Sequence, residues 1–204
     1  MLHILNHPLG AHLLAHLRDR TTPPAAFRAL SYQVSLLLAV EATRGLATRD
    51  QVVETPLETI TARVLARPLV IVPILRAGLG MVQPFTDLFP DISVGHVGLE
   101  RDHATALPRS YYQKLPPLAG THVLVVDPML ATGGSAVQAL DVLRAEGAEE
   151  MVLVCIVSSP EGVRAVEAAH PAVPIFTAAL DRELNAKKYI LPGLGDFGDR
   201  LYGT

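Results

Sequence analysis

Cysteine is nearly absent from this sequence, and tryptophan is absent altogether. The single cysteine, Cys155, has no disulfide partner within the chain, and it lies in the apolar run 151–157, where a small buried side chain is expected rather than a nucleophile. Lys and Arg total 17 against 20 Asp and Glu, so the formal charge is −3, and no basic run typical of nucleic-acid binding is present. These features disfavour a disulfide framework and a nucleic-acid-binding protein.

Long apolar runs are also missing. No segment approaches the roughly 20 apolar residues that cross a bilayer. The N-terminal segment MLHILNHPLGAH lacks the basic start, the apolar stretch and the cleavage site of a secretory signal. We therefore expect a cytoplasmic protein. A length of 204 residues, of which 50% are hydrophobic, predicts one domain spanning residues 1–204.

From residue 121 onward, short apolar β-branched runs alternate with longer amphipathic segments. This alternation predicts an α/β fold with a parallel sheet. A helix is expected to begin after Ser159, because a hydroxyl cap, a proline and an acid follow one another there. The expected strands are 122–126, 151–157 and 175–180, and the expected helices are 135–146 and a segment from 159 to about 170.

The first half of the chain contributes further elements. Apolar strands are expected at 69–75 and 92–99, with a helical stretch between them that Pro84 interrupts. Helices are expected at 9–17 and 25–44, and we expect residues 1–47 to form a helical cover. The segment 101–118 has no clear period, so it is interpreted as a loop or flexible arm.

The segment VDPMLATGGS, which ends at Ser135, has the composition of a phosphate cradle that follows a strand. Adjacent glycines let backbone N–H groups point inward, Thr132 and Ser135 add hydroxyl donors, and the next helix begins with free N–H groups. Asp127 stands at the strand end, where it can bind ribose hydroxyls or a metal-bound water. The alternative is an ordinary tight turn. The segment lacks the Gly-Lys-Ser/Thr ending of a P-loop.

A second strand end carries Arg76, Ala77 and Gly78. An arginine can direct two donors at phosphate oxygens, and small neighbours let the main chain come close. Two alternatives stay open from the residues alone. The arginine can be a solvated strand end. The run from Gly78 to Gln83 can instead be the start of an incomplete dinucleotide-binding pattern.

The C-terminal block 189–204 holds glycines and acids, so we interpret it as a shaped loop. A frayed tail is the alternative, but the many apolar side chains of this block disfavour it. Backbone groups on such a loop can match the edge of a small flat base. Elsewhere, His12 and His16 have a spacing that can bind zinc, but without a third ligand we discount a metal site there.

These segments resemble the uracil phosphoribosyltransferases, a branch of the type I phosphoribosyltransferases. VDPMLATGGS is similar to their motif for 5-phosphoribosyl 1-pyrophosphate (PRPP), VPILRAGLGMV and GLERD to their pyrophosphate-binding segments, and PGLGDFGDR to their uracil-recognition loop. The resemblance runs from about His7 to Thr204. It implies the type I phosphoribosyltransferase fold: a parallel sheet with helices on both faces, an N-terminal helical cover and a C-terminal base-recognition loop at 189–204.

The resemblance implies transfer of the phosphoribosyl group of PRPP to uracil, which gives UMP and pyrophosphate with Mg²⁺ as the cofactor. The Mg²⁺ is expected to be held mainly by PRPP oxygens and water. Dimers or tetramers and a GTP effector are further expectations. The implied catalytic residues are Asp127, Arg76, Arg101 and Asp196. The implied PRPP contacts are Arg76, Arg101, Asp127, Pro128, Met129, Leu130, Ala131, Thr132, Gly133, Gly134, Ser135 and Asp196, and the implied uracil contacts are Ile190, Gly195, Asp196 and Phe197.

The sequence departs from the family pattern at two places. Glu100 stands where a tyrosine is common, and Phe197 stands where the family has alanine. Tyr111, Tyr112 and Lys114 resemble the family's arm near the active site. An alternative function is a PRPP-sensing regulator on the same scaffold, although neither an added helix-turn-helix nor a basic face is visible in the sequence.

Overall fold

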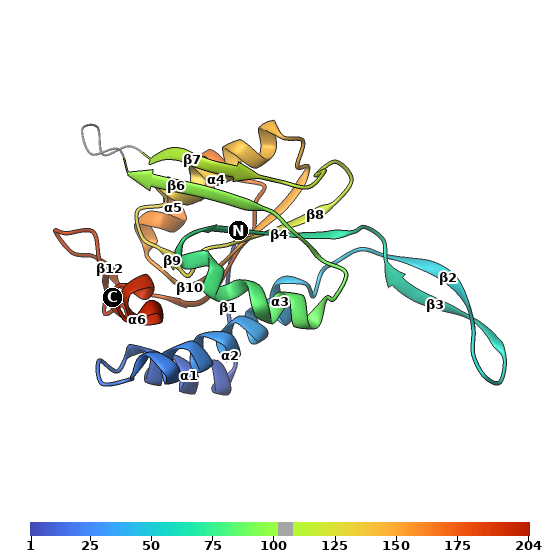
Figure 1. Ribbon diagram of the computed structural model, residues 1–204, viewed down its shortest axis with the longest axis horizontal. Helices are drawn as coiled ribbons and strands as arrows, with labels where there is room; N and C mark the ends of the chain where they lie inside the picture. Colours follow the sequence, from blue (N-terminus) through green and yellow to red (C-terminus); the bar gives the residue numbers. More distant parts are fainter. Residues whose placement is uncertain (102–107) are drawn as a thin grey trace.

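The centre of the molecule is a nine-stranded sheet (Figure 1). The computed structural model describes residues 1–101 and 108–204, without the side chains of residues 100–110. The spatial order is β1 (Leu2–Ile4), β11 (Ile175–Leu180), β10 (Glu150–Ser158), β8 (His122–Val126), β4 (Leu69–Leu75), β6 (His96–Arg101) and β7 (Pro108–Lys114), while β5 (Ser93–Val94) pairs with β4 and β9 (Met129–Leu130) with β10. Within the described residues the pairs of this sheet are parallel, except that β6 and β7 are antiparallel.

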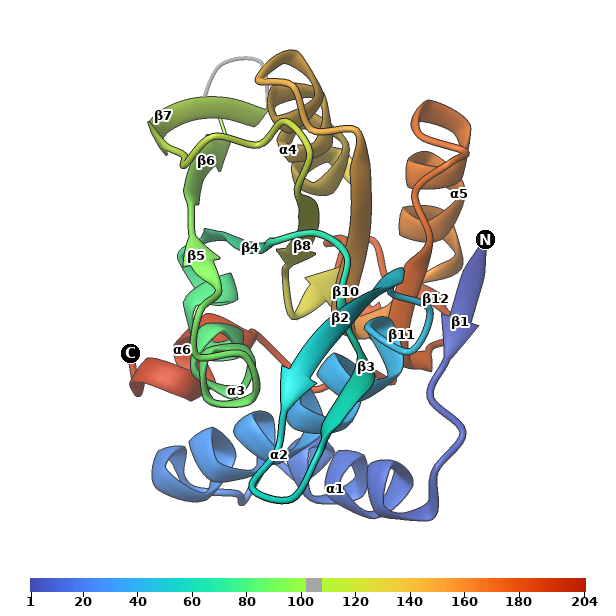
Figure 2. The ribbon, with the colours of Figure 1, turned by 90° about the vertical axis from the view of Figure 1, so that its right-hand side faces the viewer.

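Helices cover both faces of the sheet, as Figures 1 and 2 show. On one side lie α1 (Pro8–Arg18), α2 (Pro24–Ala42) and α3 (Val82–Leu88), and on the other lie α4 (Gly134–Ala145) and α5 (Pro160–Ala169). Alternate residues of β8 enter different cores: Leu124 and Val126 pack with α1 and α2, and Val123 and Val125 pack with α4 and α5. The predicted α/β class, parallel sheet and two-sided helical cover are confirmed.

Most of the predicted elements are present. The strands 69–75, 122–126 and 175–180 have the expected bounds, and Cys155 is fully buried in β10. The Ser159 hydroxyl caps α5, since it accepts a hydrogen bond from the Gly162 N–H at 3.0 Å. The helical stretch around Pro84 consists of a 3₁₀ turn, η1 (Ala77–Met81), followed by α3. Among the described residues, no helix has both the length and the apolar character needed to span a membrane.

The prediction of a loop over 101–118 is wrong for Pro108–Lys114, which forms β7 against β6. Pairing across the sheet stabilises this strand although its own sequence has no clear period. An ideal Cβ at Gly98 would lie 2.7 Å from the Tyr111 ring, so the missing side chain makes room for that ring. The predicted strand 92–99 is divided at Gly95 into β5 and β6.

Two further features were not predicted. The segment β1 adds an edge strand parallel to β11. The strands β2 (Thr48–Glu54) and β3 (Thr59–Leu65) form an antiparallel hairpin, which projects away from the rest of the molecule (Figure 1). The C-terminal block is also more regular than expected, because it contains β13 (Ile190–Leu191), which pairs with β12 (Glu183–Leu184), and the helix α6 (Phe197–Tyr202).

We predict that Ser159→Ala lowers the free energy of unfolding by about 1–3 kcal/mol, because the buried hydroxyl both caps α5 and donates to the Ala131 carbonyl at 2.6 Å. Urea unfolding of the variant and of the parent chain measures the difference. Ser93→Ala, in the exposed strand β5, is the control and should change stability little. Equal unfolding midpoints for the two variants would contradict the assigned role of Ser159.

Candidate active site

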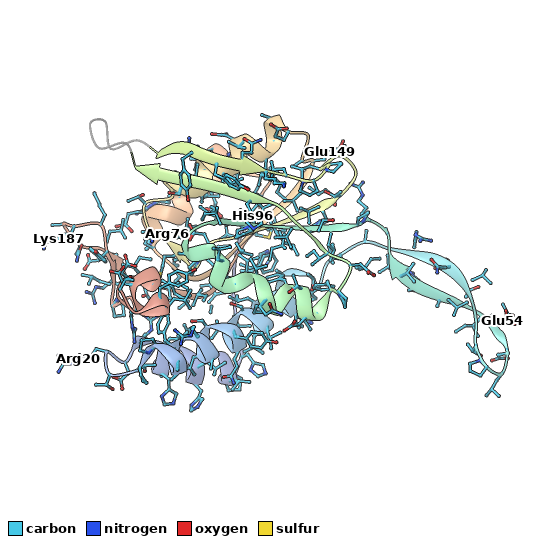
Figure 3. The ribbon with its side chains drawn as sticks, viewed as in Figure 1. Arg20, Glu54, Arg76, His96, Glu149 and Lys187 are labelled. Atoms are coloured by element: carbon cyan, nitrogen blue, oxygen red, sulfur yellow. The ribbon has the colours of Figure 1, made fainter. Side chains whose placement is uncertain are left out.

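The carboxyl ends of the parallel strands bring several predicted site residues to one edge of the sheet. Arg76 follows β4, and Asp127 follows β8, the neighbouring parallel strand. Figure 3 shows Arg76 and Lys187 toward one end of the molecule, whereas Glu149, which precedes β10, lies on the side of the β2–β3 hairpin. In open parallel sheets, ligands bind at this carboxyl edge.

The predicted phosphate cradle is a small hollow between β8 and α4. Gly133 has φ = 83° and serves as the N-cap of α4, but no side chain caps the helix. The first N–H groups of α4 therefore stay open toward the hollow, where the helix dipole favours an anion. The hollow has a volume of about 80 Å³ and is lined by Asp127, Met129, Leu130, Ala131, Thr132, Gly133, Ser135 and Ala136. Pro128 and Gly134 belong to the same segment.

The start of α5 supports this cradle from behind. The Ser159 N–H donates to the Leu130 carbonyl at 2.9 Å, and the Ser159 hydroxyl donates to the Ala131 carbonyl at 2.6 Å. An ideal Cβ at Gly162 would lie 2.5 Å from the Ala131 oxygen, so only glycine permits this close packing. The loop before α4 is thus held against the start of α5.

Asp127 has an unusual electrostatic environment. Loss of hydration raises the pKa of its carboxyl to about 7, although a hydrogen bond from the Met129 backbone acts in the opposite direction. The carboxyl therefore exchanges its proton near neutral pH. A cationic or sugar ligand that approaches from the hollow would favour the ionised form.

Arg76 is exposed at the end of β4, and no described residue forms an ion pair with it. The adjacent Gly78 lies close to β8, because an ideal Cβ there would be 2.5 Å from the Val126 carbonyl oxygen. This close approach puts the arginine segment beside the strand that carries Asp127. The backbone of Arg101 ends β6, but its side chain and that of Glu100 lie outside the described part of the structure.

A larger pocket adjoins the phosphate cradle. It has a volume of about 320 Å³ and is lined by Ala77, Met129, Ala131, Lys187, Lys188, Tyr189, Ile190, Gly195, Asp196, Phe197 and Gly198. All four residues predicted to contact uracil belong to this lining. Met129 and Ala131 line both hollows, so the pocket and the cradle open onto the same turn. The arrangement suits a ligand that has a small flat group at one end and a phosphate at the other.

The Phe197 ring does not occupy the pocket. Phe197 is 2% exposed, and its ring contacts Phe27 in an edge-to-face arrangement with 5.2 Å between the centroids. The departure from the family's alanine is therefore accommodated in the core below α6. Asp196 caps α6, because its carboxylate accepts from the Asp199 N–H at 3.0 Å.

Two residues of the pocket lie outside the segments predicted from the sequence: Lys187 and Lys188. Lys188 has φ = 66°, which is uncommon for a residue with a side chain. The turn is held by Asn185, whose side-chain oxygen accepts from the N–H groups of Lys187 and Tyr189 at 2.9 and 3.0 Å. The sequence signal was Asn185, a common turn residue, two positions before a pair of lysines.

Comparison with known proteins shows a family match over most of the chain. Residues 4–204 match the family model described as uracil phosphoribosyltransferase. A uracil phosphoribosyltransferase of Listeria welshimeri is 52% identical over 205 residues, which cover 100% of this chain and 98% of the relative. The enzyme of the same name from Dictyoglomus thermophilum is 49% identical, with full coverage of both chains.

Solved structures agree on the architecture. The AQ2163 protein from Aquifex aeolicus superposes with a TM-score of 0.95 and 35% identity, covering 100% of this chain and 99% of that one. A purine phosphoribosyltransferase from Pyrococcus horikoshii has a TM-score of 0.52 and 16% identity over 74% of this chain and 82% of its own. The second likeness concerns the fold alone, and it confirms the predicted type I phosphoribosyltransferase architecture.

The raised pKa of Asp127 predicts a pH-dependent stability. The carboxyl ionises near 3.8 when unfolded and near 7 when folded, so between these values the folded protein holds the extra proton. The free energy of unfolding should therefore fall by a few kcal/mol as the pH rises through this window, and then level off. Asp127→Asn should lack this component. Urea unfolding from pH 5 to 8 in the absence of ligand tests the prediction, which parallel curves for the two proteins would contradict.

Proposed function

This chain belongs to the uracil phosphoribosyltransferase family, and we propose that it transfers the phosphoribosyl group of PRPP to uracil, releasing UMP and pyrophosphate. The proposal rests on one observation: Met129 and Ala131 line both the phosphate cradle and the larger pocket, so the two cavities adjoin. UMP has a phosphate at one end and a flat base at the other, and a ribose between them would lie beside Asp127.

The phosphate loop supplies the anchor in this proposal. The open N–H groups at the start of α4 and the hydroxyls of Thr132 and Ser135 would bind the 5-phosphate. The support from Ser159 keeps these donors in place before the substrate arrives, so little reorganisation accompanies binding.

Asp127 and Arg76 have complementary roles. The ionised carboxylate of Asp127 would bind the ribose hydroxyls and stabilise the positive charge that develops on the sugar ring as the anomeric C–O bond breaks. Arg76 would direct its guanidinium at the departing pyrophosphate, a role that suits its exposed position and its lack of a described ion-pair partner. We propose that bond breaking runs ahead of attack by uracil N1.

The larger pocket would hold uracil. Main-chain groups at Ile190, Gly195, Asp196 and Phe197 can match the donors and acceptors on the edge of the base. The buried Phe197 ring leaves this backbone recognition possible.

The residues at the strand end fit a Mg²⁺ that arrives with PRPP. Asp127 is the carboxylate of the cradle, and the described residues contain no group of three or more His, Cys, Asp or Glu that could hold a metal by themselves. Asp127 would hold the hydrated ion while substrate oxygens supply the other contacts. When bound, the ion would neutralise charge on the pyrophosphate.

Other expectations stay predictions from the resemblance. They comprise the roles of Arg101 and Lys114, a further contact of Asp196 with PRPP or its metal, a single domain over 1–204, assembly into dimers or tetramers, a GTP effector and a cytoplasmic location.

We predict that Arg76→Ala lowers turnover by about 100-fold or more, because it removes a cation from the leaving group. Asp127→Asn should also lower turnover strongly, since it removes the charge beneath the ribose. Formation of labelled UMP from uracil, PRPP and Mg²⁺ measures both effects, and thermal unfolding checks that the variants are folded. Arg144→Ala, an exposed position in the last turn of α4, is the matched control and should keep full activity.

Unchanged UMP formation in either active-site variant would refute the corresponding role. If the parent chain binds PRPP but forms no UMP, the proposed reaction is wrong and the regulatory alternative gains support.

A further inference from the structure

The segment between β13 and α6 depends on side chains for its shape. It contains two glycines in the left-handed region, Gly193 with φ = 60° and Gly195 with φ = 85°. Within the described residues, no backbone-to-backbone hydrogen bond holds residues 192–195. Gly195 nevertheless lines the larger pocket. Some other group must therefore fix the main chain there.

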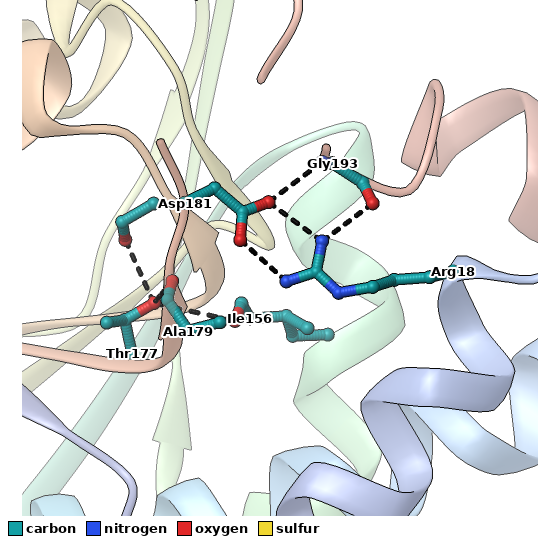
Figure 4. A network of polar contacts seen from close by, with 7 residues as sticks. Arg18, Ile156, Thr177, Ala179, Asp181 and Gly193 are labelled. Atoms are coloured by element: carbon teal, nitrogen blue, oxygen red, sulfur yellow. Dashed lines mark hydrogen bonds and ion pairs between the residues drawn. The ribbon is translucent and has the colours of Figure 1, made fainter. Parts of the chain in front are cut away.

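Arg18 and Asp181 supply that group. The two side chains form a double hydrogen-bonded ion pair, with distances of 2.6 and 2.8 Å. Both also bind Gly193: the guanidinium donates to its carbonyl at 2.7 Å, and the carboxylate accepts from its N–H at 2.8 Å. Figure 4 shows that the pair is hydrogen-bonded to both the N–H and the carbonyl of Gly193.

The pair is attached to rigid parts of the molecule. Arg18 is the last residue of α1, and Asp181 directly follows β11. The Asp181 N–H donates to the Ser158 carbonyl at 2.8 Å, and the buried hydroxyls of Ser158 and Thr177 are hydrogen-bonded to each other at 2.9 Å. Asp181 is 5% exposed, and Arg18 is 24% exposed. Charge-assisted, two-pronged contacts of this kind give strong geometric control.

A second arginine holds the next residue of the segment. Arg200 donates to the Leu194 carbonyl at 2.6 Å and to the Asp19 carbonyl at 2.6 Å. Its guanidinium also lies 4.4 Å from the centre of the Phe27 ring. The end of α1 is therefore joined to the loop at Gly193 and at Leu194, immediately before Gly195.

We propose that Arg18 and Asp181 are positioning residues that hold the loop at Gly193 in the shape required for uracil binding. The inference rests on the proposed function of the larger pocket. Neither residue lines that pocket or the phosphate cradle. Loosening the pair should therefore displace the backbone that contacts the base and leave the PRPP phosphate loop intact.

The test uses Arg18→Lys and Asp181→Asn. Lysine keeps the charge but cannot hold the carboxylate and the Gly193 carbonyl with one planar fork. We expect the KM for uracil to rise by about 10-fold, which corresponds to about 1.4 kcal/mol. The KM for PRPP should change by less than about 3-fold, which is below 1 kcal/mol. In the double variant, the KM for uracil should rise by less than the product of the two single-variant rises. Both substitutions disrupt the same ion pair, so their effects are not independent.

Arg28→Lys is the matched control. Arg28 also joins the N-terminal helices to the C-terminal segment, but it donates to the Leu201 carbonyl in α6 rather than to the loop, at 2.9 Å. Its uracil KM should stay near that of the parent chain. Equal rises in both KM values, or an effect of Arg18→Lys no larger than that of Arg28→Lys, would overturn the proposal.

Hydrogen exchange separates this proposal from the proposed function. Arg18→Lys should speed exchange at the amides of residues 193–197 while exchange in α4 is unchanged. Faster exchange in a protein that forms no UMP would retain the loop-holding role and reject its connection to uracil. Unchanged exchange at the loop would reject the positioning role even if the parent chain forms UMP normally.

Discussion

The parallel pairing of β4, β8, β10 and β11 is the constraint on which the site depends. Parallel strands end at the same edge, so residues far apart in the sequence become neighbours there. Arg76, Asp127 and Asp181 each follow one of these strands, at β4, β8 and β11. Because helices bury both faces of the sheet, the strand ends have little freedom to move. The polar residues that follow the strands are therefore held in fixed positions.

The same edge combines two opposite electrostatic conditions. The start of α4 is uncapped by side chains and favours an anion. A short distance along the chain, loss of hydration raises the pKa of Asp127 to about 7, so that its negative charge is costly until a ligand compensates it. A ligand with a phosphate and a polar or cationic centre satisfies both conditions, whereas a simple anion satisfies only the first.

The sequence predicted those parts of the structure that local chemistry determines. The strands 69–75, 122–126 and 175–180, the Ser159 cap and the glycine turn before α4 each follow from their local composition. Strand β7, edge strand β1 and the β2–β3 hairpin were missed, because their pairing partners stabilise them more than their own patterns do. The bonds from Arg18 to Asp181 and Gly193 span 163 and 175 residues, and no local pattern indicates contacts of that kind.

Backbone recognition of a base requires a main chain that keeps its shape without regular secondary structure. Glycines permit the required φ values at positions 193 and 195, but they also increase the freedom of the chain. In the described structure that freedom is limited by side chains from α1, from the end of β11 and from α6. The N-terminal helices, which form a cover distant in sequence from the pocket, are thus structurally part of it. We expect a change at the end of α1 to reach the larger pocket through Gly193 and Leu194, whereas the start of α5 supports the loop before α4.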